Sequence, residues 1–160
     1  MAIRRFGLLS DTHGLLRPQT LQALEGMEHL VHAGDVGSPD VLEALRARFP
    51  LTVVRGNVDH GAWAEALPLT DTVELGGVLV HVLHDLGQLD LDPAAAGIGV
   101  VVSGHSHKPA IQRRRGVLYV NPGSCGPRRF DLPVTVALLY VRADGVDAEL
   151  VPLRVESPHR

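Results

Sequence analysis

The sequence predicts an α/β fold that approaches α+β through its mixture of strands, and three patterns support this prediction. Short apolar runs alternate with amphipathic runs in the first half, as in a β-α-β-α-β unit. A Gly-Gly turn then joins two strand-like runs, which indicates that antiparallel pairing begins there. Polar, glycine-containing segments follow the first three apolar runs. The 160 residues show no linker or repeat, so we expect a single domain over residues 1–160.

The first half contains three predicted strands separated by two predicted helices. Apolar runs place the strands at residues 3–9, 30–32 and 51–54. Between them, apolar residues recur every three or four positions, which is the spacing of one helix face. Pro18 and Pro39 stand before these stretches, where a first helical turn tolerates proline.

The second half is predicted to consist mainly of strands. Residues 72–75 and 78–83 form the hairpin around Gly76-Gly77, and a short helix is possible within residues 85–96, limited by Pro93. Later apolar runs predict strands at residues 98–103, 110–114, 117–121, 134–141 and 146–153. The polar tail at residues 156–160 is expected to be frayed.

Composition excludes several classes of function. A net charge of −3 gives no overall attraction to nucleic acid. The apolar runs are far shorter than the roughly 20 residues of a membrane-spanning helix, and the N-terminus lacks the core of a signal peptide. The single cysteine, Cys125, excludes an intramolecular disulfide and fits a reducing compartment, so we expect a cytoplasmic protein.

Seven polar side chains follow predicted strands. Asp11 and His13 alternate in sequence, as do His105 and His107, so each pair shares one face of an extended segment. In open α/β sheets, ligands bind beyond the carboxyl ends of the strands. The candidate metal ligands are therefore Asp11, His13, Asp35, Asn57, His84, His105 and His107.

This mixture of carboxylate, amide and imidazole groups indicates the kind of metal. It suits Mn, Fe, Zn, Co or Ni better than Ca or Mg, which prefer oxygen ligands. One metal needs about four protein ligands, so seven candidates predict two metals bridged by Asp35. Such a pair activates a bound water as hydroxide and neutralises charge on a phosphoryl group. We therefore expect hydrolysis at phosphorus, with Asp35, Asn57 and His84 as the catalytic residues.

The order of five motifs resembles the calcineurin-like metallophosphoesterase superfamily. These motifs are D-x-H at Asp11, G-D at Asp35, G-N at Asn57, the lone His84, and G-H-x-H at 104–107. The resemblance runs from about Leu8 to Ser124. Length and the GNVD segment are similar to the small bacterial and archaeal phosphodiesterase branch, which also contains the retromer subunit of this fold.

The resemblance implies a four-layer αββα sandwich of two mixed β-sheets flanked by helices. It also implies that one metal is held by Asp11, His13, Asp35 and His107. The other would be held by Asp35, Asn57, His84 and His105. Manganese is the expected metal, and a dimer or tetramer of the chain is the expected assembly.

Two positions depart from the family pattern. Larger members have the segment GNHE and use its histidine near the leaving group. Here Val58 follows Asn57, so the sequence does not identify the general acid. Asp59 matches the small branch, and His60 is a weak substitute. Asp85 stands where the family usually has glycine, and it would either orient a ligand or repel an anionic substrate.

Other polar residues receive plainer interpretations. Asn57, Arg17 and Arg128 are candidate substrate contacts, with Arg129 next to the last of them. His81 competes with His84, but it lies inside its apolar run. Cys125 is expected to be a passive small residue. The remaining histidines are expected to be surface or hydrogen-bonded structural residues, namely His29, His32, His60 and His159.

Three functions remain open on the sequence alone. The leading prediction is a phosphodiesterase that acts on a small phosphate ester. A phosphomonoesterase or nucleotidase at the same metals is the second. A non-catalytic binding scaffold, like the retromer subunit, is the third, although all seven candidate positions keep coordinating side chains.

Overall fold

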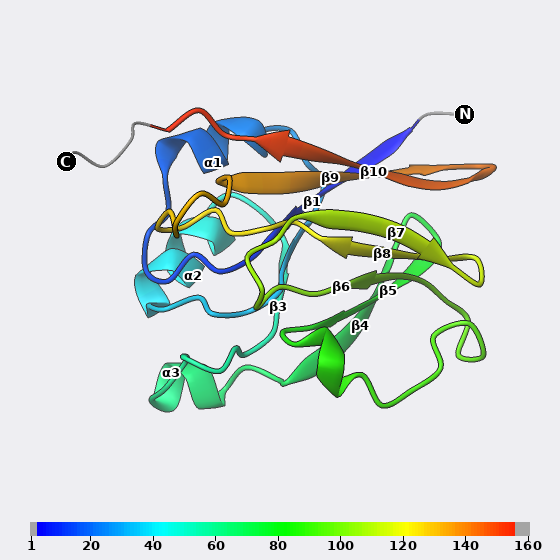
Figure 1. Ribbon diagram of the computed structural model, residues 1–160, viewed down its shortest axis with the longest axis horizontal. Helices are drawn as coiled ribbons and strands as arrows, with labels where there is room; N and C mark the ends of the chain where they lie inside the picture. The colour runs from blue at the N-terminus through cyan, green and yellow to red at the C-terminus, as the bar shows by residue number, and fades with distance from the viewer. Residues whose placement is uncertain (1–2, 156–160) are drawn as a thin grey trace.

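The structure is a computed structural model that describes residues 3–155, so the expectations for the tail at 156–160 and for His159 lie outside the described residues. Two five-stranded sheets pack face to face (Figure 1). The first has the order β10-β9-β1-β2-β3 and the second the order β4-β5-β6-β8-β7. Both contain parallel and antiparallel pairs, which confirms the predicted fold class of two mixed sheets.

The strand bounds follow the apolar runs closely. The first sheet consists of β1 (Arg4–Leu9), β2 (Leu30–His32), β3 (Leu51–Val53), β9 (Thr135–Arg142) and β10 (Gly145–Pro152). The second consists of β4 (Thr70–Leu75), β5 (Val78–Leu83), β6 (Ile98–Val102), β7 (Ala110–Arg114) and β8 (Val117–Asn121).

The helices flank the two sheets unequally. In the first half, α1 (Pro18–Ala23) and α2 (Pro39–Arg46) connect the parallel strands β1, β2 and β3, and both begin at a proline as predicted. The Ser38 hydroxyl caps α2 by accepting from the Asp40 amide at 3.1 Å. A third helix, α3 (Ala62–Glu65), is a single turn that was not predicted from the sequence.

The outer face of the second sheet has a thin cover. The short helix expected within residues 85–96 is the 3₁₀ turn η1 (Leu86–Gln88). Leu86 and Leu89 pack there against a small apolar cluster on the sheet, made of Leu83, Ile98, Val101 and Val117. The loop after η1 lies over the same face, so this side of the molecule carries cavities that helices would otherwise fill.

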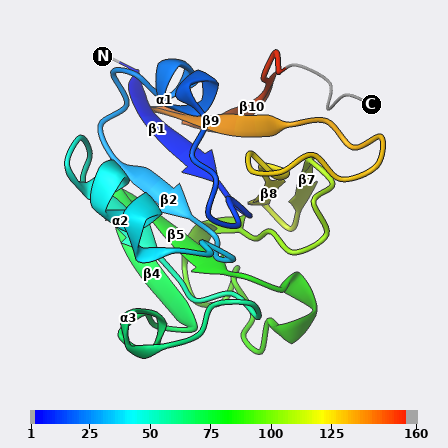
Figure 2. The same cartoon turned by 90° about the vertical axis from the view of Figure 1, so that its left-hand side faces the viewer.

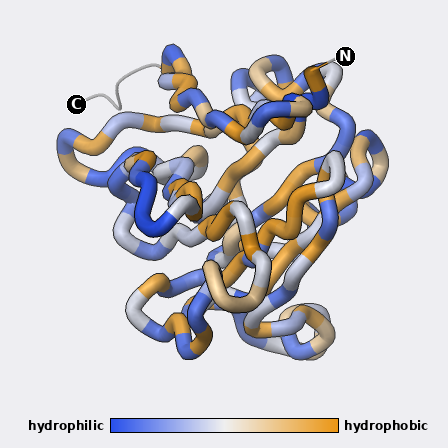
Figure 3. The backbone as a smooth tube through the Cα atoms, turned by 90° about the vertical axis from the view of Figure 1, so that its right-hand side faces the viewer, coloured by the Kyte–Doolittle hydropathy of each residue, from blue (hydrophilic) through white to orange (hydrophobic). Residues whose placement is uncertain are grey.

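The main core lies between the sheets. Phe6 and Leu8 of β1 meet Val80 of β5 and Val120 of β8 there, all with exposed fractions of 1% or less. Figure 3 shows the hydrophobic strands running through the centre of the molecule. Across residues 3–155, every helix is too short or too polar to cross a membrane.

Candidate metal centre

The seven candidate ligands lie on loops that follow five strands. Figure 2 shows the ends of β1, β2 and β5 converging, and the loops after β3 and β6 complete the group. Parallel neighbours bring their carboxyl ends to one edge, and the facing sheets bring the two edges together. The structure therefore gathers residues that lie almost one hundred positions apart.

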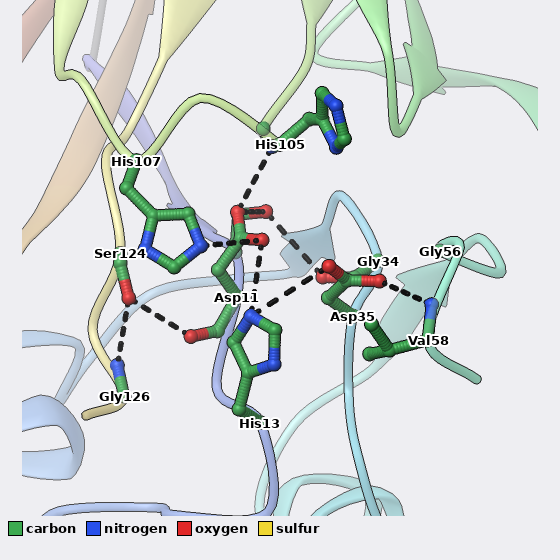
Figure 4. A network of polar contacts seen from close by, with 12 residues as sticks. Asp11, His13, Gly34, Asp35, Gly56, Val58, His105, His107, Ser124 and Gly126 are labelled. Atoms are coloured by element: carbon green, nitrogen blue, oxygen red, sulfur yellow. Dashed lines mark hydrogen bonds and ion pairs between the residues drawn. The ribbon is translucent and has the colours of Figure 1, made fainter. Parts of the chain in front are cut away.

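One part of the group surrounds the Asp11 carboxylate. Its Oδ1 lies 3.3 Å from His107 Nε2 and 3.5 Å from His13 Nε2. His13 Nε2 is also 3.6 Å from Asp35 Oδ2. Figure 4 shows these four side chains pointing toward one another.

The other part extends from Asp35 toward the surface. Asp35 Oδ2 lies 3.2 Å from His84 Nε2, which is 3.3 Å from His105 Nδ1. The same His105 nitrogen lies 3.2 Å from Asn57 Oδ1. Asp35 Oδ2 is thus common to both parts, and all seven side chains meet at one site.

The arrangement fits divalent metals. Ligand atoms about 2.1 Å from a shared ion lie roughly 3.0–3.4 Å from one another, close to the separations seen here. Asp11 Oδ1 and His13 Nε2 are buried and have no hydrogen-bond partner within residues 3–155. A cation between them would satisfy both atoms, and such orphaned buried atoms are otherwise costly.

Hydrogen bonds from the surrounding chain orient the ligand atoms. The Val58 amide donates to Asp35 Oδ1 at 3.0 Å. Ser10 Oγ and the His105 amide donate to Asp11 Oδ2 at 2.6 Å and 3.1 Å. His84 Nδ1 donates to the Ala33 carbonyl at 2.8 Å, which leaves the Nε2 lone pair facing the site. Each carboxylate therefore directs its second oxygen at the centre.

The charges of the metal-free site agree with this geometry. Burial alone would raise the pKa of Asp11, but the nearby rings of His107 and His13 and the hydrogen bond from Ser10 hold it below its ordinary range. Burial would also raise the pKa of Asp35, but the contacts of Asp35 with His84 and with the Val58 amide lower this pKa overall. Burial lowers the pKa of His84, but the hydrogen bonds with Asp35 and Ala33 raise it overall, so this proton competes with a metal.

The backbone is strained at the site. Positive φ angles between 46° and 71° occur at five of the candidate ligands, namely Asp11, His13, Asp35, His105 and His107. A left-handed residue other than glycine costs of order 1–3 kcal/mol and persists where the surrounding structure requires it. The loop after β3 also approaches the site so closely that residue 56 must be glycine, because a Cβ there would collide with the Asp35 carboxylate and amide. Strain concentrated on ligand residues is typical of a functional site.

Asp59 supports the site in a way that the sequence analysis missed. Its carboxylate is 4% exposed and accepts from three backbone amides, those of Val36 at 3.2 Å, Gly37 at 2.9 Å and Gly56 at 2.8 Å. These amides belong to the loops that carry Asp35 and Asn57. The signal was present, because Asp59 matched the small family branch, but its contacts are not visible in sequence.

Four histidines within residues 3–155 lie outside the site, in structural or surface positions. His32 is fully buried and bonds Thr12 Oγ1 at 3.0 Å, and His29 bonds Thr52 Oγ1 at 2.8 Å. His81 bonds Thr72 Oγ1 at 2.8 Å on β4, so His84 rather than His81 reaches the site. His60 is exposed.

The N-P-G-S segment after β8 braces two of the site loops. Ser124 Oγ donates to the Asp11 carbonyl at 2.9 Å, and Asn121 Nδ2 donates to the Gly104 carbonyl at 3.0 Å. Cys125 is fully buried and its pKa is raised to about 12 by burial, which fits a passive role.

The candidate substrate contacts differ in their surroundings. Arg17 Nε and Nη2 both donate to the Gly126 carbonyl at 3.2 Å, so this guanidinium braces a loop. Arg128 is exposed, as is Asn57. Asp85 Oδ1 accepts from the Gly87 amide at 3.0 Å and caps η1, a local role that neither of its predicted alternatives included.

Comparisons with known proteins agree with this site. The chain is 31% identical over 157 residues to a probable metallophosphoesterase of Methanothermobacter thermautotrophicus, covering 91% of this chain and 90% of the relative. A solved archaeal phosphodiesterase superposes with a TM-score of 0.75 at 21% identity, over 93% of this chain and 99% of that one. Vps29 from Chaetomium thermophilum also superposes with a TM-score of 0.75, at 18% identity, over 94% and 98%.

The match to a known family covers most of the chain. The profile of the calcineurin-like phosphoesterase superfamily domain extends over residues 5–144, which includes all five motifs. Members of this family bind divalent metals, and the Asp11, His13 and His107 group is placed to do so. This chain therefore belongs to the calcineurin-like phosphoesterase superfamily.

Proposed function

We propose that the protein is a phosphodiesterase that uses two divalent metals. The observation that carries this proposal is the position of Asp35 Oδ2, 3.6 Å from His13 Nε2 and 3.2 Å from His84 Nε2. One carboxylate oxygen is thus shared between two groups of ligands. When bound, a pair of divalent cations lowers the pKa of a water and neutralises charge on the phosphoryl oxygens.

The proposed ligands divide around Asp35 as the family resemblance implies. Asp11, His13 and His107 form the buried group, and Asn57, His84 and His105 form the outer group. The exposed amide of Asn57 is the group placed to contact a phosphoryl oxygen, with its Oδ1 directed at His105. Arg17 and Arg128 stay as proposed outer contacts to the substrate phosphate.

The residue after Asn57 restricts the choice of leaving group. Val58 is 40% exposed and offers no proton donor on its side chain, where larger members use histidine. Substrates whose leaving alcohol needs little protonation should therefore react fastest. Manganese as the metal, a cytoplasmic location and a homo-oligomeric assembly are part of the same proposal.

The deciding experiment measures metal dependence and substrate class together. After chelator treatment, Mn, Ni, Co, Zn or Mg is returned separately and initial rates are taken on bis(p-nitrophenyl) phosphate and p-nitrophenyl phosphate. We expect diester turnover that returns with metal. A preference for the monoester would promote a phosphomonoesterase or nucleotidase, and no turnover with any metal would favour a non-catalytic scaffold.

A matched pair of variants tests the bridging role. Asp35→Asn should lower metal-restored diester turnover by roughly 10²-fold or more, beyond the usual cost of losing an outer partner of a ligand. Asp144→Asn makes the same chemical change at an exposed turn and should leave the rate unchanged. Equal rates in both variants would remove the proposed bridge.

A further inference from the structure

A cavity opens directly beside the candidate metal centre. It has a volume of about 340 Å³ and shares Gly104 and His105 with the site. From there it runs along the outer faces of β7 and β8, at the edge of the second sheet (Figure 1), to Tyr119 and Arg114. Pockets of this size hold small organic molecules in proteins.

Tyr119 and Arg114 form the far wall of this cavity. The Arg114 guanidinium lies 5.4 Å from the centre of the Tyr119 ring. The two residues come from adjacent antiparallel strands and stand diagonally on the same face, within reach of long side chains. Tyr119 also packs against the apolar cluster beneath η1, and Arg114 Nη2 donates to Gln112 Oε1 at 2.7 Å. The wall is therefore formed before any ligand arrives.

The near wall, next to the metals, is held equally firmly. Asn121 Nδ2 donates to the Gly104 carbonyl at 3.0 Å and to Ser106 Oγ at 3.1 Å. Asn121 Oδ1 accepts from the Gly123 amide at 2.9 Å. Both polar atoms of this side chain are thus bonded within the protein, Nδ2 to the loop after β6 and Oδ1 to its own loop, so the wall gives shape to the cavity.

The charge of the cavity is positive. Lys108 and Arg114 both line it, and neither forms a salt bridge with any residue from 3 to 155. Its one carboxylate, Asp85, already accepts from the Gly87 amide at the cap of η1. An aromatic group that carries a phosphate nearby would thus meet both a stacking surface and cations.

A different cavity also borders His105. It also has a volume of about 340 Å³, and it is lined by Arg55, Asn57 and Asp90 among others. Both cavities share Asp85 and His105. A phosphodiester carries two alcohol components on its phosphorus, and two cavities that both border the site could each receive one of them.

We propose that the cavity of Tyr119 and Arg114 binds a planar heteroaromatic ring, of the size of a nucleobase, on one alcohol component of the diester. This inference rests on the proposed phosphodiesterase function and specifies its substrate class as nucleoside phosphodiesters. Stacking on Tyr119 and Arg114 binds the ring, and the polar side chains of Gln112 and Lys108 line the same cavity.

The first test measures binding without turnover. Metal-loaded protein is titrated calorimetrically with thymidine 5′-phosphate and with deoxyribose 5-phosphate, which differ only in the base. Wild type should bind the nucleotide roughly tenfold or more tightly, as base–aromatic stacking provides. In Tyr119→Ala the two affinities should become equal within about twofold.

A matched control exists on the first sheet. Tyr140 on β9 is also paired with an arginine, Arg142, at 5.9 Å, but it lines neither cavity. Tyr140→Ala should keep the preference for the nucleotide. Loss of that preference in both variants, or its absence in wild type, would overturn the proposed base site.

The second test follows hydrolysis of the methyl diesters of the same two compounds. Wild type should show a higher kcat/KM for the thymidine diester, and Tyr119→Ala should lose this advantage through KM. If neither diester is hydrolysed but Tyr119-dependent nucleotide binding persists, the phosphodiesterase proposal fails and the base site stands. Hydrolysis of both diesters at equal rates would support the phosphodiesterase and reject the base site.

Discussion

The two halves of the candidate metal centre differ in how firmly the protein holds them. In the inner half, Asp11 is fully buried and His107 is 3% exposed. In the outer half, Asn57 and His105 are exposed, and their side chains contact each other across two loops. The inner half is therefore the more enclosed part of the site, and the outer half is the part open to solvent.

This difference predicts different defects on removal of a side chain from each half. Loss of a residue that only hydrogen-bonds to a metal ligand lowers metal affinity roughly 10–100-fold. His107→Ala should lower it by more, because the variant removes a buried candidate ligand beside Asp11. Asn57→Ala should reduce kcat by roughly a hundredfold to a thousandfold while most of the metal stays bound.

Metal content by elemental analysis and diester kinetics at saturating metal separate the two defects. The comparison breaks if Asn57→Ala loses as much metal as His107→Ala. It also breaks if excess metal restores the rate of Asn57→Ala to that of wild type.

Asp59 gives the next largest expected effect, because it joins the inner and outer loops. Asp59→Ala would leave the amides of Val36, Gly37 and Gly56 without their acceptor. We expect a loss of about 2–4 kcal/mol in the free energy of unfolding, together with weaker metal binding. Urea unfolding measures the first effect.

The control for this variant is Asp71→Ala, which removes an exposed carboxylate bonded to a single neighbouring amide. It should change stability by less than about 0.5 kcal/mol. If the two variants are equally stable, Asp59 does not fix the site loops.

The pH dependence of folding stability tests the structural role of His32, which bonds Thr12 next to the inner half. Because the Gly34 amide donates to Nδ1 at 3.0 Å, the proton lies on Nε2, which donates to Thr12 Oγ1. Burial lowers the pKa of His32 to about 4 from 6.5, against the attraction of Asp11 and Asp59. Between these values only the unfolded chain is protonated, so acid removes about 3 kcal/mol of stability as pH falls from 6.5 to 4.

Nitrogen NMR measures the state of this ring directly. At pH 5.5 the spectrum should show neutral His32 with its proton on Nε2. A fully protonated His32 at that pH would contradict both the burial argument and the proton position.

The smallest effect is expected at Cys125, which lies beside the inner half without contacting its ligand atoms. Its thiol is buried, and burial raises its pKa to about 12, so no thiolate is present at neutral pH. Cys125→Ser should leave diester turnover within about twofold, with a stability cost of about 1 kcal/mol. A hundredfold loss of rate in a folded variant would assign the sulfur a chemical role.

Much of the fold could be predicted because strands and helix starts are local. The apolar run at 30–32 coincides with β2. The prolines at 18 and 39 are the first residues of α1 and α2. The turn α3 was missed, since four residues show no period. All seven candidate ligands were predicted because each follows an apolar run, although their roles as ligands remain predictions.

Sequence by itself determined the strands, the polar loops at their ends and the chemical types of the candidate ligands. Only the tertiary structure decided that β9 lies between β10 and β1, that Asp59 clamps two loops, and that Tyr119 and Arg114 wall a cavity beside His105. The reason is physical. Hydrophobic period and turn preference act over a few residues, whereas hydrogen bonds and cavities depend on segments that meet only when both sheets have packed.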